Sequence, residues 1–230
     1  TQDRALTPRV VVQISIFVVG VPMLPLLITG RWGWWEAWIY ALTSILGFAI
    51  SRGLAARRHP DLLAERARSM GHQDAKPWDR WLAPVVALGS GLIPLVAGLD
   101  VRFGWSPSCS APMKGMSLIG ILGGYGLGSY ALIANPFFSG TVRIQKERDH
   151  RVVSSGPYRW VRHPGYVGAL LTYLGTPCFL DARWAFLPAG VLAVAVVMRT
   201  ALEDRALREE LDGYDNYTKK VRYRLLPGVW

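Results

Sequence analysis

The sequence predicts an all-α protein built as a multi-pass transmembrane helical bundle. Of its 230 residues, 51% are hydrophobic and only 18% are charged. About a quarter of the residues are charged in an ordinary soluble domain. The hydrophobic residues also gather in long runs that are free of charged residues apart from Glu36, close to the end of one run, which argues against a water-soluble domain.

Four hydrophobic runs approach the length of about 17–25 residues that a helix needs to cross the hydrocarbon core of a bilayer. They are residues 10–29, 34–51, 81–99 and 118–134. Two shorter runs, 166–180 and 184–198, are joined by Asp181, Ala182 and Arg183 and predict a short helical hairpin. We therefore expect about six spans. The shortness of the last two also allows a re-entrant pair that reaches only partway into the bilayer.

Basic residues are distributed unequally over the two sides that this topology creates. The formal net charge is +10, and 22 of the 26 Lys and Arg residues fall in the N-terminus and in segments 52–80, 135–165 and 199–230. Because cytoplasmic loops of membrane proteins hold the excess of Lys and Arg, we expect both termini and these segments to be cytoplasmic. The membrane topology explains the basic excess, so no nucleic-acid partner is expected.

Two patterns in the predicted bundle have a structural interpretation. Gly120, Gly124 and Gly128 recur every fourth residue within a hydrophobic run, which favours a close contact with another helix over a dinucleotide-binding loop. Residues 60–70 predict a short amphipathic helix that lies on the membrane. The two cysteines form no CxxC motif, and no metal site is expected.

The chain changes character at Asn135, after which polar and aromatic residues gather at predicted membrane boundaries. Residues 156–168 read GPYRWVRHPGYVG and lead into the fifth predicted helix. Pro164 suits the first turn of a helix, and the free amides that follow attract an anion. His163 lies at this helix start between Tyr158 and Tyr166. It either binds a ligand or only caps the helix, and both interpretations stay open.

A second polar group follows the last hydrophobic run. Arg199, Glu203 and Asp204 are expected on the same helix as it leaves the membrane. Arg199 and Glu203 are one turn apart, so they form either an ordinary ion pair or part of a binding site. The apolar residues at 225–230 predict a C-terminal segment that docks on the protein, beyond a short cytoplasmic helix.

These motifs, taken in order, resemble a known family. GPYRWVRHPGYVG, the Glu203-Asp204 pair, Tyr214-x-x-Tyr217 and the closing VRYRLLPGVW are similar to the isoprenylcysteine carboxyl methyltransferase family and its phospholipid N-methyltransferase relatives. The stretches at 60–66 and 99–107 resemble prokaryotic members. The family's acidic pair is usually Glu-Glu, so the shorter Asp204 is a departure from its pattern.

The resemblance implies an integral-membrane methyltransferase that uses S-adenosylmethionine and methylates a lipophilic substrate entering from the bilayer. Glu203 would accept hydrogen bonds from the ribose, His163 and the helix amides would hold the methionine carboxylate, and Tyr158 or Tyr166 would face the sulfonium. Arg199 would orient an acceptor carboxylate, with Arg222 or Arg224 as alternatives. The expected cofactor-binding residues are Gly156, Tyr158, His163, Pro164, Tyr166, Glu203 and Asp204, and the expected catalytic residues are Arg199 and Glu203.

The expected organisation has two parts. Residues 1–134 form N-terminal transmembrane helices with the cytoplasmic loop 52–80, and residues 135–230 form a methyltransferase core with the cofactor pocket. The expected location is a prokaryotic inner membrane. Two other interpretations compete with this one: a nicotinamide-dependent enzyme like the membrane sterol reductases, and a non-enzymatic membrane protein or small transporter.

Overall fold

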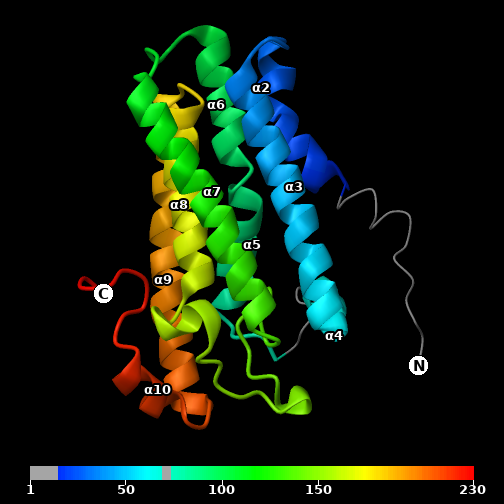
Figure 1. The fold of residues 1–230 in the computed structure, drawn as a ribbon, viewed down its shortest axis with the longest axis vertical. Helices are drawn as coiled ribbons and strands as arrows, with labels where there is room; N and C mark the ends of the chain where they lie inside the picture. The colour runs from blue at the N-terminus through cyan, green and yellow to red at the C-terminus, as the bar shows by residue number, and fades with distance from the viewer. Residues whose placement is uncertain (1–14, 69–73) are drawn as a thin grey trace.

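The computed structural model describes residues 15–68 and 74–230, and all regular elements in these two ranges are helical (Figure 1). The prediction of an all-α protein is therefore confirmed. The longer elements are α2 (Val21–Thr29), α3 (Trp35–Arg58), α4 (Pro60–Arg68), α5 (Asp79–Gly89), α6 (Leu92–Phe103), α7 (Ala111–Ala134), α8 (Pro164–Phe179), α9 (Phe186–Glu210) and α10 (Tyr214–Lys220). Short helical turns occupy η1 (Ile16–Gly20), η3 (Lys146–Arg148), η4 (Gly156–Arg159) and η5 (Arg183–Ala185).

Within the described residues, four segments are long and apolar enough to cross a membrane. They are α3, the α5–α6 segment Asp79–Phe103, α7, and the η5–α9 segment Arg183–Glu210. The helical segment Ile16–Thr29 is apolar but shorter, and α8 has only 16 residues. The beginning of the first predicted run, 10–14, lies outside the described residues. The number of about six spans therefore stays a prediction, whereas the short hairpin formed by α8 and α9 is present.

The run predicted as one helix over 81–99 is divided in the structure, where α5 ends at Gly89 and α6 begins at Leu92. Pro94 explains the division, because a proline lacks the backbone N–H and its ring clashes with the carbonyl four residues earlier, here that of Ser90. The end of α5 at Gly89 is also a point of close packing. A Cβ built on Gly89 would lie 2.8 Å from Cδ2 of Leu192, so α9 packs directly against the end of α5.

The long helices lie side by side along one axis (Figure 1). The main contacts join α2 with α6, α3 with α7, α5 with α9, and α7 with α8. The core includes the buried side chains of Leu26, Ile93, Ile121, Phe179 and Leu192, each from a different helix. Segment 135–163, α4 and α10 gather at one end of the bundle, and the turns around 30–34, 104–110 and 180–185 lie at the other. The described parts of segments 52–80 and 135–165 and helix α10, which are expected to share one side of the membrane, thus share one end of the bundle; the N-terminus lies outside the described residues.

The contact between α7 and α8 depends on glycine. A Cβ on Gly124 would lie 2.5 Å from the carbonyl oxygen of Gly168, and a Cβ on Gly168 would lie 2.5 Å from the carbonyl oxygen of Gly124. Gly120 and Gly128 lie on the same side of α7, and the amide nitrogen of Gly128 is 2.9 Å from the Cβ position of Gly168. The predicted close helix contact is confirmed, with α8 as the partner.

We expect Gly124→Ala to lower the melting temperature of the protein in detergent. The added methyl group would have to push α7 away from α8, and such overpacking costs about 1–3 kcal/mol, more than the gain of about 1 kcal/mol in helix propensity. Gly123→Ala is the matched control, because a Cβ at Gly123 has no neighbouring atom within 4 Å. Equal melting temperatures for the two variants would contradict this account.

Candidate active site

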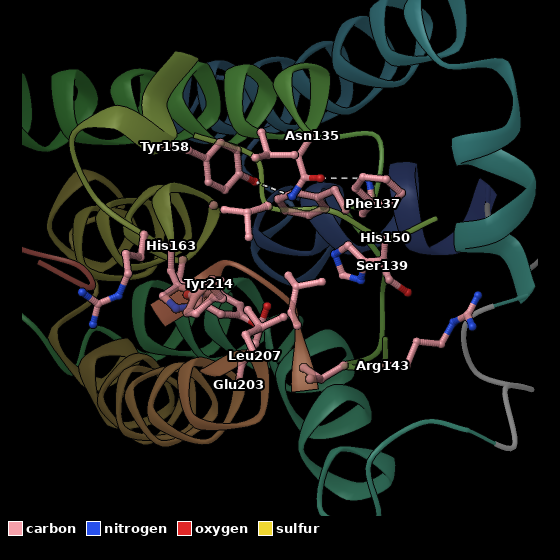
Figure 2. A pocket seen from close by; sticks show the side chains of 18 of the residues that line it. Asn135, Phe137, Ser139, Arg143, His150, Tyr158, His163, Glu203, Leu207 and Tyr214 are labelled. Carbon is pink, nitrogen blue, oxygen red and sulfur yellow. Dashed lines mark hydrogen bonds between the residues drawn. The ribbon is translucent and has the colours of Figure 1, made fainter. Parts of the chain in front are cut away.

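A cavity of about 980 Å³, counted out to its open mouth, lies where segment 135–163 meets the start of α8, the last turns of α9 and α10 (Figure 2). Five of the residues predicted from the sequence line this cavity: Tyr158, His163, Tyr166, Arg199 and Glu203. Arg66 of α4 and the aromatic side chains of Phe137, Tyr214 and Tyr217 complete much of the wall. The fold thus gathers polar groups from segments up to 150 residues apart around one space.

Glu203 and Tyr166 form a direct pair on the cavity wall. The hydroxyl of Tyr166 donates a hydrogen bond to Oε2 of Glu203. The ring of Tyr166 also stacks on that of His163, with 5.8 Å between the ring centroids and 20° between the planes. The carboxylate and the two rings therefore form one connected surface.

Arg199 pairs with Asp79 rather than with Glu203. Its Nε lies 2.6 Å from Oδ1 of Asp79, and its Nη2 lies 2.9 Å from Oδ2. Nη2 also donates to the carbonyl of Gly140 at 2.8 Å, and the guanidinium carbon lies 5.6 Å from the centroid of the Tyr166 ring. The alternative of an ordinary i, i+4 ion pair between Arg199 and Glu203 is wrong, because the packing of α5 against α9 supplies a carboxylate in a better position.

Asp79 is a residue that sequence reasoning missed. It is fully buried at the start of α5, and besides Arg199 it accepts a hydrogen bond from the backbone N–H of Val142 at 2.6 Å. It therefore holds together α5, α9 and the segment that covers the cavity. The available signal was weak, since the sequence shows only a single carboxylate two residues before a predicted span.

Asp204 is the centre of a buried network. Its carboxylate accepts hydrogen bonds from Nε and Nη2 of Arg162 at 2.7 and 3.1 Å, from the Tyr214 hydroxyl at 3.0 Å and from Nε of Arg224 at 2.8 Å. Nε2 of His163 lies 3.4 Å away. Asp204 is fully buried and does not line the cavity. Its position ties α9 to the start of α8, to α10 and to the C-terminal tail.

The tail docks on the turn that precedes α8, as predicted. The backbone N–H of Arg162 donates to the carbonyl of Tyr223 at 2.9 Å, and that of His163 donates to the carbonyl of Arg224 at 3.0 Å. The Arg162 guanidinium donates to two further tail carbonyls at 2.8 and 2.7 Å. His163 is the N-cap residue of α8, but its side chain makes no capping hydrogen bond; whether it also binds a ligand stays a prediction.

Two other predicted residues shape the backbone without lining the cavity. Gly156 has a φ of +59°, and a Cβ on it would lie 3.1 Å from the Cβ of Ala134. Pro164 is the buried first residue of α8. Tyr158, which follows in η4, lines the cavity and accepts a hydrogen bond at its carbonyl from the Tyr217 hydroxyl at 2.6 Å.

The wall of the cavity formed by segment 137–150 contains a histidine that sequence reasoning also missed. The rings of His150 and Phe137 lie 4.5 Å apart, and Nδ1 of His150 accepts a hydrogen bond from the backbone N–H of Gln145 at 3.3 Å. Burial and the nearby guanidiniums of Arg143 and Arg148 lower the pKa of His150 to about 4. The imidazole is therefore neutral at physiological pH.

We expect His150 to make the folded protein less stable as the pH falls from about 6.5 to 4. In that window the unfolded chain takes up a proton on His150 that the folded protein resists, so the free energy of unfolding declines. His150→Gln should lose less stability than the parent between pH 7 and pH 5, measured as melting temperature in detergent. The same pH dependence in parent and variant would contradict the assignment.

A larger cavity adjoins the first. Its space, counted out to its openings, is about 1860 Å³, and mainly apolar residues of η1, α2, α3, α5, α7 and α8 line it. The two cavities share part of their walls: Arg66, Phe138, Gly140, Thr141, Gly165, Tyr166 and Arg199. Tyr166 and Arg199 therefore stand at the boundary between a polar cavity and an apolar one.

The fold and the site together define an integral-membrane protein with a polar ligand cavity at one end of its helical bundle and an apolar cavity between its helices. Residues 120–209 match the sequence model of the isoprenylcysteine carboxyl methyltransferase (ICMT) family. The match includes α7, α8 and α9 and the segments between them.

The chain is also similar in sequence to individual proteins named protein-S-isoprenylcysteine O-methyltransferase. The chain is 33% identical over 107 residues to protein-S-isoprenylcysteine O-methyltransferase of Schizosaccharomyces pombe, which is 44% of this chain and 43% of the relative. It is 32% identical over 91 residues to a probable protein-S-isoprenylcysteine O-methyltransferase of Oryza sativa subsp. indica, covering 36% of this chain and 45% of the relative. It is 40% identical over 63 residues to the Saccharomyces cerevisiae protein, covering 27% and 26%. The chain thus spans less than half the length of these relatives in each comparison.

Proposed function

We propose that this protein is an integral-membrane methyltransferase that uses S-adenosylmethionine and methylates a lipophilic acceptor, namely the carboxylate of a prenylated or lipid-like molecule. The observation that supports this most is the wall that the two cavities share. The apolar cavity lies between helices that a bilayer would surround.

The residues of the polar cavity suit the chemical groups of such a cofactor. Glu203 uses Oε2 for Tyr166, and Oε1 has no donor among the described residues, so it can accept hydrogen bonds from a ribose diol. The start of α8 beside His163 suits a carboxylate through the positive end of the helix dipole, although Pro164 has no N–H and the N–H groups of Tyr166 and Val167 donate to the carbonyl of His163. Tyr158 and Tyr166 offer aromatic faces to a cation. When bound, S-adenosylmethionine supplies a methyl group on a positively charged sulfur.

Asp204, Gly156 and Pro164 contribute to this site indirectly in our proposal. Asp204 orients His163 and keeps Arg162 in place, while its own oxygen atoms are occupied by protein donors. Gly156 and Pro164 set the course of the backbone on either side of Tyr158. We therefore assign direct cofactor contacts to Tyr158, His163, Tyr166 and Glu203.

Arg199 is the residue to which we assign the orientation of the acceptor. Asp79 fixes its guanidinium through two hydrogen bonds, and its Nη1 has no acceptor among the described residues. A carboxylate acceptor needs no general base, since methyl transfer to it consumes its negative charge, and a dry cavity favours such a step. The alternatives Arg222 and Arg224 line neither cavity, and Arg224 is bonded to Asp204.

Our proposal includes the placement of the protein in its membrane. The protein lies in the inner membrane of a prokaryotic cell. The acceptor reaches the apolar cavity from the bilayer, and the polar cavity opens on the cytoplasmic side. The unequal distribution of Lys and Arg supports this orientation, because 22 of 26 fall in the segments assigned to that side. Accessibility of an introduced cysteine at position 218 to an impermeant reagent in intact cells would overturn it.

The proposed cofactor is tested by ligand stabilisation. A ligand raises the melting temperature of the folded state that it binds, so S-adenosylmethionine should stabilise the purified protein and NADPH should not. Incubation with methyl-labelled cofactor and membrane lipid extract, followed by mass spectrometry, should then reveal a labelled lipophilic product. Stabilisation by NADPH alone would favour the reductase interpretation instead.

We expect His163→Ala and Glu203→Ala each to weaken the binding of S-adenosylmethionine by roughly ten- to a hundredfold. Each variant removes a charge-assisted hydrogen bond, which contributes about 1.5–3 kcal/mol. Calorimetry on the purified variants measures the affinity. Glu209→Ala is the control, because Glu209 lies on the same helix but is exposed and pairs only with Arg205. Unchanged affinity in both test variants would reject the assignment.

Arg199→Lys should lower kcat/KM while it leaves the affinity for S-adenosylmethionine unchanged. An ammonium group cannot reproduce the planar, two-pronged contact of a guanidinium with Asp79 and with an acceptor carboxylate. A fall in kcat would indicate an interaction made in the transition state, and a rise in KM alone would indicate uniform substrate binding. If cofactor affinity fell in parallel with Glu203→Ala, Arg199 would belong to the cofactor site instead.

A further inference from the structure

Arg52 of α3 faces the large apolar cavity in an unusual environment. It lines that cavity and not the polar one. Its Nη1 donates to the Ser51 hydroxyl at 3.2 Å, and its guanidinium carbon lies 4.5 Å from the centroid of the Phe48 ring. Within the described ranges, 15–68 and 74–230, no carboxylate forms an ion pair with Arg52. A positive charge therefore stands on the wall of an apolar cavity, where it contacts a hydroxyl and an aromatic face and has no carboxylate partner among the described residues.

The position of Arg52 differs from that of the arginines that end the same helix. Arg57 and Arg58 are exposed, as is usual for basic residues that reach from a helix end toward the membrane interface. Arg52 is instead partly buried, on the side of α3 opposite the exposed apolar residues Leu46, Ile50 and Leu54. Removing a charge from water is costly unless a partner compensates it. This suggests that the partner of Arg52 is a molecule in the cavity.

Arg66 of α4 extends the positive region toward the polar cavity. It lines both cavities, donates from Nη1 to the carbonyl of Phe138 at 3.0 Å, and lies 5.2 Å from the centroid of the Phe138 ring. Burial and the nearby guanidiniums of Arg52 and Arg199 lower the pKa of Arg66 to about 9. Three guanidinium groups thus lie near this end of the large cavity, and that of Arg199 is paired with Asp79.

We propose that Arg52, with Arg66 beside it, forms a binding site for the acidic group of the lipophilic acceptor, a carboxylate or a phosphate. This inference rests on the proposed methyl transfer and deepens it, because it names the residues that select an acidic acceptor over an uncharged one of the same chain. Arg52 and Arg66 bind the acidic group as the acceptor enters the large cavity, and Arg199 at the shared wall orients the same group for the reaction. An acceptor whose polar end is a cationic amine is disfavoured at this site by charge repulsion.

The acceptor is a better occupant of this site than a phospholipid of the surrounding bilayer. Arg52 lines a cavity whose other walls come from α5, α7 and α8, so a bound acidic group lies inside the bundle. The outer face of α3, which bilayer lipids would touch, is apolar at Leu42, Leu46, Ile50 and Leu54. A molecule that enters this cavity and reaches Arg66 also reaches the wall of the polar cavity.

The test compares two probes on the cofactor-free protein in uncharged detergent. One probe is a farnesyl thioether that ends in a carboxylate, and the other is the same thioether ending in a carboxamide. Calorimetry should show that the parent binds the carboxylate roughly ten- to a hundredfold more tightly, as expected for a charge-assisted hydrogen bond. Arg52→Gln should reduce this preference to about threefold or less and leave carboxamide affinity unchanged. Arg52→Lys should retain part of the preference.

Arg57→Gln is the matched control, since it removes the same charge from an exposed position on the same helix. It should keep the preference of the parent. An Arg52→Gln variant with the parent's preference, or an Arg57→Gln variant with an equal loss, would overturn the proposal. A third measurement addresses bilayer lipid: native mass spectrometry of protein from nanodiscs containing phosphatidylglycerol. Loss of bound phosphatidylglycerol in Arg52→Gln, with the probe preference intact, would assign the site to a lipid and overturn the proposal.

The outcome for Arg52 is separable from the outcome for methyl transfer. If the parent shows the Arg52-dependent preference but transfers no labelled methyl group to any lipophilic acceptor, the acidic-group site stands and the proposed reaction fails. If the parent transfers the methyl group and Arg52→Gln keeps the full preference, the reaction stands and the site fails. In the reaction itself, Arg52→Gln should raise KM for the carboxylate acceptor and leave cofactor affinity unchanged.

Discussion

The buried carboxylate of Asp204 is the interaction on which the polar end of this protein depends. A fully buried carboxylate is tolerated only when donors surround it, and Asp204 has four, from three segments: Arg162 and His163 before α8, Tyr214 of α10 and Arg224 of the tail. These donors bring the start of α8, the end of α9, α10 and the tail to one point. Removing the carboxylate would leave two arginines without their partner in a low-dielectric region. The wall of the polar cavity is a consequence of this network.

The Arg199–Asp79 pair performs a comparable role at the boundary between the cavities. It joins α9 to α5, and through Val142 and Gly140 it also holds the segment that covers the site. The bundle is closed on the other side by the glycine contact between α7 and α8, where side chains are absent and backbones approach closely. Tight packing on that side and a wide space between α3, α5 and α7 leave the large cavity within the bundle.

The segment that is similar to known methyltransferases does not contain all the residues that line the two cavities. The matched segment 120–209 contains much of the polar cavity, including Tyr158, His163, Tyr166 and Glu203. The large cavity owes many of its walls to η1, α2, α3 and α5, all of which precede this segment. Similarity over segment 120–209 therefore does not require a shared acceptor. Arg52 and Arg66, which we connect with the acceptor, belong to the part of the chain outside the family match.

The sequence by itself determined the helical class, the hydrophobic segments, the glycine contact and the docked tail, because these depend on composition, run length and local spacing. It also identified Tyr158, His163, Tyr166 and Glu203 as neighbours, through motifs at recognisable separations. Only the tertiary structure decided that Arg199 pairs with Asp79, 120 positions away, and that the oxygens of Asp204 are fully engaged within the protein. The partner of a buried charge is set by which helices pack together, and spacing along one helix does not contain that information.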